Sequence, residues 1–270
     1  MRKIDPPSIN DAFLLRALTS SRSDHAAAIL HRENSIIDRY ELYLANNGDP
    51  WVVMEDVSFN SIKDSLKSLY NSPPTVLSFI ESLRVGIDGA CPVCGRSALG
   101  TLDHYLPKSS YSEYSFYSKN LVPACDRCNN KRGDLVRGDS PHERPLHPYF
   151  DGVAVNRILS VKFEGDLRAP RITPIAVGVV GTNLLTVKWH IENVLVPAGA
   201  LEYFDSMWGV LLSDKRDILF DLSSLKAIRD SVAWVERYEA KKNKSLNCWD
   251  SAFYHGIKMD NSVLKFLLSH

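Results

Sequence analysis

The stretch that decides the fold is residues 91–130, which read CPVCGRSALGTLDHYLPKSSYSEYSFYSKNLVPACDRCNN. It begins with the pair Cys91 and Cys94 and ends with the pair Cys125 and Cys128. Each CxxC pair lets two thiolates converge on one ion, and two pairs fill the four tetrahedral positions of a structural zinc. Two disulfides are the alternative, but the rest of the sequence has no feature typical of a secreted protein. We therefore predict a structural Zn²⁺ held by four sulfurs.

The segment between the two cysteine pairs is 30 residues long, which exceeds the spacer of about 15–20 residues in a plain zinc ribbon. Residues 101–106 are typical of a short strand, and they include the adjacent pair Asp103 and His104. Residues 120–123 predict a second strand, and the polar run from Asp126 predicts a helix. The expected order is strand, loop, strand and helix, with the zinc joining the two ends.

These residues resemble a known family. Asp103-His104, Asn120-Leu121 and Cys128-Asn129 resemble the HNH endonuclease motif in the zinc-containing version of the ββα-metal fold. The longer string LDHYLPKS…NLVPACDRCN, followed by HPYFD at 147–151, is similar to the HNH nucleases of Septu-type antiphage systems. The resemblance implies a phosphodiester hydrolase that acts in antiphage defence. It also implies a separately encoded ATPase partner, and this chain contains no Walker A loop of its own.

Hydrolysis of a phosphodiester needs an activated water and stabilisation of the charge on the phosphoryl and leaving oxygens. A neutral imidazole suits the first task, so we expect His104 to be the general base. A hard cation such as Mg²⁺ or Mn²⁺ suits the second, and Asp103 and Asn129 carry the oxygens that it prefers. A capping or salt-bridging role is the alternative for Asp103. Because side chains alternate along a strand, Asp103 and His104 can serve the metal and the water separately. The family resemblance gives Asn120 a supporting catalytic role, in which it fixes the loop or orients the base.

Three basic residues flank the proposed metal site, and we expect them to contact phosphates: Lys108, Lys131 and Arg132. A solvated surface role is their alternative. The tyrosines of this module are predicted to pack it, with base stacking as the alternative: Tyr105, Tyr111, Tyr114 and Tyr117. His147 either assists at the site or fixes the following segment, and the sequence leaves its role unassigned.

The charge of the chain is balanced, with 32 basic and 32 acidic residues. Residues 91–151 hold eight basic and seven acidic side chains, and a dedicated nucleic-acid binder is usually more basic. We therefore expect weak binding by the free protein, with a shallow salt dependence and a partner that supplies further positive surface. No apolar run is long enough for a membrane helix and no signal peptide is visible, so a cytoplasmic location is expected.

The predicted fold class is α+β, organised as three regions packed into one body. Residues 1–88 are expected to be helical, 89–151 to form the HNH module, and 152–270 to combine strands and helices. In the last region alternating or continuous apolar residues near 161–163, 172–180 and 185–191 predict two or three strands. Helices are expected at 201–212, at 222–235 behind an Asp221 cap, and at 249–270.

These observations favour a metal-dependent endonuclease, with DNA as the expected substrate. An RNA nuclease of the same chemistry is the first alternative, because the recognition of a 2′-OH is not visible in a sequence. The second alternative is a non-catalytic, zinc-stabilised module that binds nucleic acid or protein.

Overall fold

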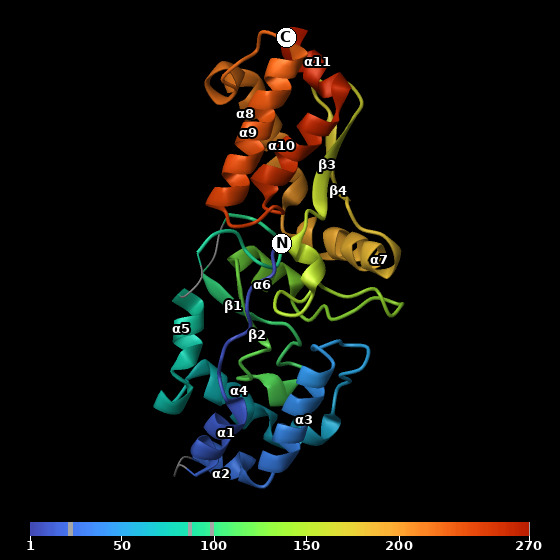
Figure 1. The fold of residues 1–270 in the computed structure, drawn as a ribbon. Coiled ribbons are helices and arrows are strands. Elements are labelled where there is room, and N and C mark those ends of the chain that lie inside the picture. Colours follow the sequence, from blue (N-terminus) through green and yellow to red (C-terminus); the bar gives the residue numbers. More distant parts are fainter. Residues whose placement is uncertain (21–23, 86–87, 98–99, 270) are drawn as a thin grey trace.

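Helices dominate the structure, and two small antiparallel sheets complete it, which confirms the α+β class. The computed structural model describes residues 1–20, 24–85, 88–97 and 100–269. Figure 1 shows the N-terminal helices at one end, the last helices of the chain at the other end and the strands β1 and β2 between them. The HNH module therefore lies in the middle of the molecule, between these two groups of helices.

The N-terminal region is helical, as predicted. Its elements are α1 (Asp11–Thr19), α2 (Asp24–Leu30), α3 (Glu33–Ala45), the 3₁₀ turn η1 (Val57–Ile62), α4 (Lys63–Asn71), the 3₁₀ turn η2 (Thr75–Leu77) and α5 (Phe79–Val85). One face of α4 carries the buried side chains of Leu66, Leu69 and Tyr70. This helical spacing turns one face of α4 toward the central module.

The central module has the predicted strand, loop, strand and helix. Strand β1 (Thr101–His104) pairs antiparallel with β2 (Leu121–Ala124), and α6 (Asp126–Arg132) follows. Asp103 lies opposite Val122, and His104 lies opposite Leu121. The connecting loop contains the 3₁₀ turn η3 (Ser112–Tyr114). Cys125 caps α6, since its sulfur accepts a hydrogen bond from the backbone N–H of Cys128.

The second sheet follows the 3₁₀ turn η4 (Gly152–Val155) and consists of β3 (Leu159–Glu164) and β4 (Arg171–Ala176). Along β3 the buried Val161 and Phe163 alternate with the exposed Lys162 and Glu164. This period of two confirms the first two predicted strands, although β4 ends before the predicted position 180.

The predicted strand at 185–191 is wrong. The segment forms α7 (Gly181–His190), which continues as the π-helix η5 (Ile191–Leu195). The alternation of apolar residues from 185 to 191 competes with a helical spacing of Val187, Ile191, Val194 and Leu195, all of which are buried. The helical period wins, and it leaves Leu185 51% exposed.

The remaining helices are α8 (Ala200–Ile218), α9 (Leu225–Lys242), α10 (Trp249–Met259) and α11 (Asn261–Ser269). The prediction that Asp221 caps this helix is wrong. Ser224 caps α9 by accepting a hydrogen bond from the N–H of Ala227. The predicted single helix over 249–270 is interrupted at Asp260, whose carboxylate accepts hydrogen bonds from Ser262 and Val263 at the start of α11. His270 lies outside the described residues.

Segments distant in sequence meet at the zinc-binding end of the HNH module. The indole N–H of Trp249 donates to the carbonyl of Cys94 at 2.7 Å, and the backbone N–H of Arg2 donates to Pro92 at 3.1 Å. Gly95 has a φ of +90°, and a Cβ there would lie 2.3 Å from the carbonyl oxygen of Asn247. A glycine is therefore required where the first cysteine pair packs against the C-terminal region.

A search of the helices in the described part of the chain finds none with the length and apolar character that a membrane crossing needs.

Close packing of α10 on β3 provides a test of the fold. A Cβ at Gly256 would lie 2.4 Å from Cγ2 of Val161, whereas a Cβ at Gly209 in α8 would meet nothing within 4 Å. Gly256→Ala is expected to lower the free energy of unfolding by about 1–3 kcal/mol through overpacking. Gly209→Ala should raise it by up to about 1 kcal/mol, because alanine favours a helix over glycine. Denaturant titration of both variants measures these changes, and equal effects would contradict the packing.

Candidate active site and zinc centre

Four buried sulfurs converge at one end of the HNH module. The Sγ atoms of Cys91, Cys94, Cys125 and Cys128 all lie within 4.8 Å of one another, and none of the four is in a disulfide. A tetrahedral Zn²⁺ with Zn–S distances of about 2.3 Å separates its sulfurs by roughly 3.8 Å. The sulfurs of Cys94 and Cys125 are 3.7 Å apart. The cluster thus has the composition and spacing of a structural zinc site.

Backbone N–H groups support these sulfurs. The N–H of Arg96 donates to Cys94, that of Cys125 to Cys91, and that of Cys128 to Cys125, each at 3.4 Å. Such donors stabilise thiolates and fix the direction of the metal ligands. The fifth cysteine, Cys248, is buried outside this cluster.

A separate cavity of about 260 Å³ lies on the ββα side of the module. Three predicted site residues line it together: Asp103 and His104 from β1, and Asn129 from α6. Lys108, predicted to contact phosphate, also lines it. Asn120, Lys131 and Arg132 are not among its lining residues. We refer to this cavity as the HNH pocket.

His104 is held in one tautomer. Its Nε2 lies 2.8 Å from the carbonyl oxygen of Ser115, so Nε2 carries the proton and Nδ1 carries the lone pair. The ring is buried and packs edge-on against Tyr70 at a centroid distance of 4.4 Å. Burial lowers the pKa of His104 to about 3, although the Ser115 carbonyl opposes this shift. The imidazole is therefore neutral at pH 7.

Asp103 is paired with Arg132. The guanidinium Nε and Nη2 donate to the two carboxylate oxygens at 2.8 and 2.9 Å, and both side chains are buried. Arg132 also donates to the carbonyl oxygens of His104 and Tyr105. Burial raises the pKa of the Asp103 carboxyl, and the Arg132 charge acts in the opposite direction. Each carboxylate oxygen accepts one hydrogen bond from Arg132 and keeps a further lone pair.

The structure does not place Arg132 at the surface, where phosphate contact was expected. Arg132 is buried instead, because its guanidinium compensates the buried charge of Asp103. The expected phosphate contact by Arg132 is therefore corrected. Lys131, the residue before it, is exposed on α6.

Asn120 is fully buried and braces the loop between the two strands. Its Oδ1 accepts from the N–H of Leu106 at 2.7 Å, and its Nδ2 donates to the carbonyl oxygens of Leu106 and Tyr114 at 2.9 and 3.2 Å. It therefore joins the start of the loop to η3, one residue before the carbonyl of Ser115 that holds His104. This geometry suits the loop-fixing role that the family resemblance implies.

Asn129 is half-buried, and with Asp103 it brings carboxylate and amide oxygens to the HNH pocket. Asp134 also lines the pocket, where Ser109 donates to one of its oxygens at 2.6 Å. Among the described residues, only the four cysteines gather His, Cys, Asp or Glu closely enough to enclose a metal by themselves. Mg²⁺ commonly binds through one or two carboxylates and completes its shell with waters and substrate phosphates. The donor set of the pocket fits such a cation.

The N-terminal helices contribute to this pocket, which the sequence did not reveal. Lys67 of α4 lines it, and Lys108 lies above the ring of Tyr70 at 4.4 Å. Burial lowers the pKa of Lys108, and the charge of Lys67 acts in the same direction. In the sequence, nothing distinguishes Lys67 and Tyr70 of α4 from the residues of an ordinary amphipathic helix.

His147 fixes the following segment. Its Nδ1 accepts from the N–H of Tyr149 at 3.1 Å, and its Nε2 lies 2.9 Å from the hydroxyl of Tyr43. That hydroxyl donates in turn to Oδ1 of Asn120 at 3.2 Å. Burial lowers the pKa of His147 to about 3. A neutral His147 thus links α3 to the HNH loop.

The tyrosines of the module pack its interior, as predicted. All four are buried: Tyr105, Tyr111, Tyr114 and Tyr117. Tyr117 stacks on Tyr40 of α3 with ring centroids 4.2 Å apart. Their faces are therefore turned to the core and not to a bound base.

Comparison with known proteins agrees with this geometry. Residues 91–135 match the family model described as HNH endonuclease. Protein ea31 of Escherichia phage lambda is 31% identical to this chain over 102 residues, which cover 37% of this chain and 32% of the lambda protein. The chain thus spans about a third of the length of that curated relative. No solved structure gives a significant match. The central module is an HNH endonuclease domain.

The zinc centre predicts a composition that can be measured. Natively purified protein should contain about one zinc per chain. Cys91→Ser should lower the zinc content and the melting temperature together, because metal binding and folding are linked. Cys248→Ser removes a buried thiol outside the cluster and should leave the zinc content unchanged. Metal analysis and thermal denaturation provide the readouts, and a folded, zinc-free wild type would contradict the assignment.

The buried ion pair of Asp103 and Arg132 predicts that Arg132 and its neighbour Lys131 contribute differently to stability. Arg132→Ala leaves the Asp103 charge buried without a partner and should lower the free energy of unfolding by about 3–5 kcal/mol. Lys131→Ala, at the adjacent exposed position, should change it by less than about 0.5 kcal/mol. Urea titration compares the two variants. A small effect at Arg132 would mean that the pair does not stabilise the module.

Proposed function

We propose that this protein is a metal-dependent endonuclease that hydrolyses phosphodiester bonds, with DNA as its substrate. The observation that carries the proposal is the state of His104. Its Nε2–H is held by the Ser115 carbonyl, and its ring lines the pocket that also contains Asp103, Asn129 and Lys108. This is the arrangement that a general base beside a metal-assisted hydrolysis requires.

In this proposal Nδ1 of His104 removes a proton from the attacking water. The neutral ring is in the correct protonation state, but a pKa of about 3 makes it a weak base in the free protein. The negative charge of a bound phosphodiester would raise that pKa toward the working pH, because a nearby anion favours the imidazolium. The base would thus gain strength when substrate is present.

Lys108 and Lys67 would contact the scissile phosphate or its neighbour, since both line the pocket. Asp103 and Asn129 would hold Mg²⁺ or Mn²⁺. When bound, that cation supplies charge neutralisation on the phosphoryl oxygens and on the leaving oxygen. Asn120 and Arg132 would act indirectly, by holding the loop and the Asp103 carboxylate.

The choice of DNA over RNA, the antiphage role and the separately encoded ATPase partner are supported by the resemblance to Septu-type nucleases. The comparison with protein ea31 adds no support for a defence role, because that relative is a phage protein. DNA and RNA are therefore separate arms of the experiment below.

The test is cleavage of plasmid DNA and of total RNA with Mg²⁺ or Mn²⁺. Because His104 packs on Tyr70, His104→Gln is preferred to alanine, which would leave a cavity. The variant should lower the cleavage rate by about 10²–10⁴-fold, the usual contribution of a general base. Its zinc content should equal that of the wild type.

The matched control is His31→Gln, at an exposed position between α2 and α3, which should cleave at the wild-type rate. Full activity in His104→Gln would show that another group is the base. Cleavage of RNA without cleavage of DNA would select the RNA nuclease.

A further inference from the structure

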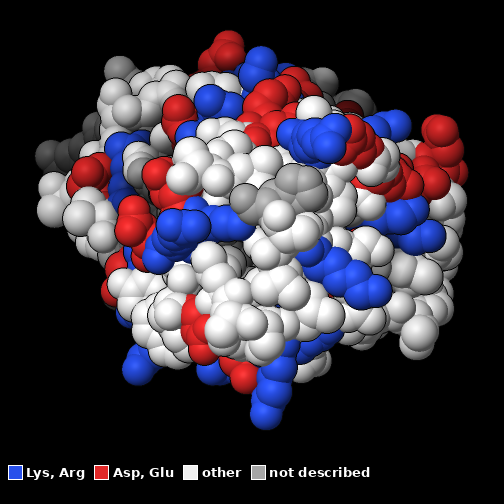
Figure 2. Space-filling view, turned by 90° about the horizontal axis from the view of Figure 1, so that it is seen from above, with Lys and Arg blue, Asp and Glu red and all other residues white. Residues whose placement is uncertain are grey.

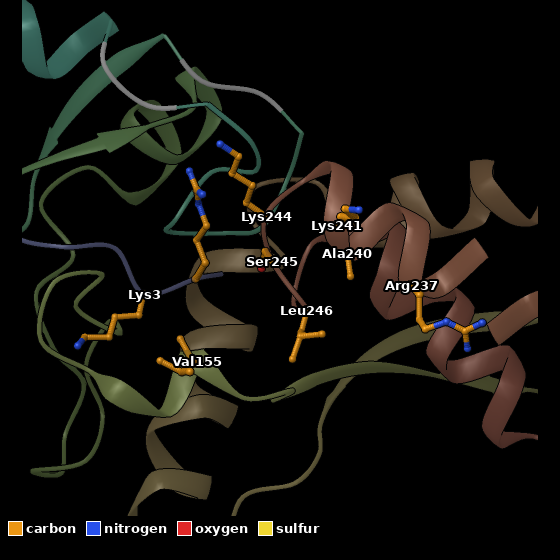
Figure 3. A pocket seen from close by; sticks show the side chains of 10 residues that line it. Lys3, Val155, Arg237, Ala240, Lys241, Lys244, Ser245 and Leu246 are labelled. Carbon is orange, nitrogen blue, oxygen red and sulfur yellow. The ribbon is translucent and has the colours of Figure 1, made fainter. Parts of the chain in front are cut away.

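A hollow lined by cations lies beside the zinc centre, away from the HNH pocket. Its volume is about 500 Å³, and five basic residues line it: Arg2, Lys3, Arg237, Lys241 and Lys244. No Asp or Glu is among its lining residues in the described part of the chain. Figure 3 shows Lys3 coming from the N-terminal segment, and Arg237, Lys241 and Lys244 from the end of α9 and the turn after it. We refer to this site as the basic hollow.

The charge of the basic hollow is largely uncompensated. The side chains of Lys3, Arg237 and Lys241 are exposed. Within the described residues no ion pair or hydrogen bond involves their charged groups. Lys244 pairs with the exposed carboxylate of Asp88 at 2.7 Å. Arg2 is only 8% exposed, and it donates to the backbone carbonyl of Asp88 while its buried Nε has no partner. Among the described residues, the Asp88 carboxylate thus pairs with one cation of the hollow, Lys244, and the sulfur of Cys91 in the zinc cluster adds negative charge near Arg2.

Helix capping alone does not explain this cluster. Lysines near the end of α9 interact favourably with the negative end of the helix dipole, which accounts for Lys241. Arg237 lies one turn earlier, and Arg2 and Lys3 come from the other end of the chain. Three basic residues are therefore assembled by the fold at positions where the dipole does not require them.

A cluster of positive charges is unusual for this molecule. The whole chain has 32 basic and 32 acidic residues. Figure 2 shows the end of the molecule formed by the C-terminal helices, where basic and acidic side chains are interspersed. A concave surface of one sign focuses the electrostatic potential and attracts polyanions.

The basic hollow is joined to the HNH domain through the zinc-binding loop. The N–H of Ala90 donates to the carbonyl of Asn243 at 2.9 Å, and Ser97 donates to the side chain of Asn243 at 2.6 Å. Asn243 lies between the lining residues Lys241 and Lys244. The loop carries Cys91, whose sulfur belongs to the same cluster as that of Cys128, the residue before Asn129. A polyanion in the hollow would thus be held next to the catalytic domain.

We propose that the basic hollow binds the phosphate backbone of the nucleic acid that the HNH domain cleaves. This inference rests on the proposed function and adds to it a second contact outside the active site. Flexible Lys and Arg side chains position a backbone without reading its sequence. The hollow supplies positive surface that the nearly neutral residues 91–151 lack, and it does so within this chain.

The test is the salt dependence of binding by the full chain to duplex DNA, measured without added Mg²⁺ or Mn²⁺ so that cleavage does not remove the ligand. The triple variant Lys3→Gln, Arg237→Gln, Lys241→Gln alters exposed, unpaired cations and should fold normally. The slope of log K against log salt should become shallower by about 0.9 for each lost phosphate contact, or roughly 2–3 in all.

The matched control is Lys188→Gln, Lys226→Gln, Lys265→Gln, which removes the same charge from exposed positions outside the basic hollow. Its slope should stay within about 0.5 of that of the wild type, because contacts that are not made release no counterions. A triple hollow variant with the slope and affinity of the control would overturn the proposal, while wild-type cleavage would leave the proposed function intact.

Three further outcomes separate the remaining explanations. Loss of binding to vesicles containing anionic lipid, with an unchanged slope on DNA, would assign the hollow to a membrane surface and refute the proposal. A wild type that neither binds nor cleaves DNA or RNA would refute the nuclease function itself. Weaker cleavage by the hollow variant at low salt and sub-saturating DNA, with a difference from the wild type that shrinks as salt is raised, would support the proposal.

Discussion

The convergence of four sulfurs is the constraint on which the rest of the structure depends. The ββα core has two strands of four residues each and a helix of seven residues, and an isolated two-stranded hairpin is marginally stable in water. The sulfur cluster joins the residues before β1 to the first turn of α6. It therefore fixes the helix that carries Asn129 relative to the strand that carries Asp103 and His104. The zinc that the cluster is suited to hold would supply folding energy that so small a core lacks.

Buried polar groups refine this framework. The pair of Asp103 and Arg132 holds a carboxylate at the pocket without leaving an uncompensated charge in the interior. Asn120 closes the loop from both sides, and Tyr43 and His147 extend that network to α3 and to the segment after the domain. Such networks specify one arrangement when every member is satisfied. The orientation of His104 is thus set by Ser115 and Tyr70, which are not among the lining residues of the pocket.

Local patterns in the sequence predicted the local features of this site. The two cysteine pairs predicted the zinc centre, and the spacing of the strands predicted the ββα order. Both patterns lie within the 40 residues 91–130, so no long-range contact was needed to recognise them. The failures had longer-range causes. The sequence did not show that Arg132 is buried against Asp103, since a basic residue at the end of a short helix is usually solvated. It did not reveal Lys67 at the pocket, Tyr70 against His104, or Lys3 and Lys241 in one hollow, because only the tertiary fold brings these positions together. At 185–191 two periodicities competed, and packing decided for the helix.

If one module holds two metals with different duties, zinc is bound by sulfur and a hard cation by oxygen. Anomalous diffraction from crystals soaked in Mn²⁺, recorded at the zinc and manganese absorption edges, distinguishes the two sites. We expect a zinc peak among Cys91, Cys94, Cys125 and Cys128, and a separate manganese peak in the HNH pocket beside Asp103 and Asn129. Manganese at the sulfurs, or a pocket that stays without manganese when a nucleic-acid substrate is bound, would contradict this expectation.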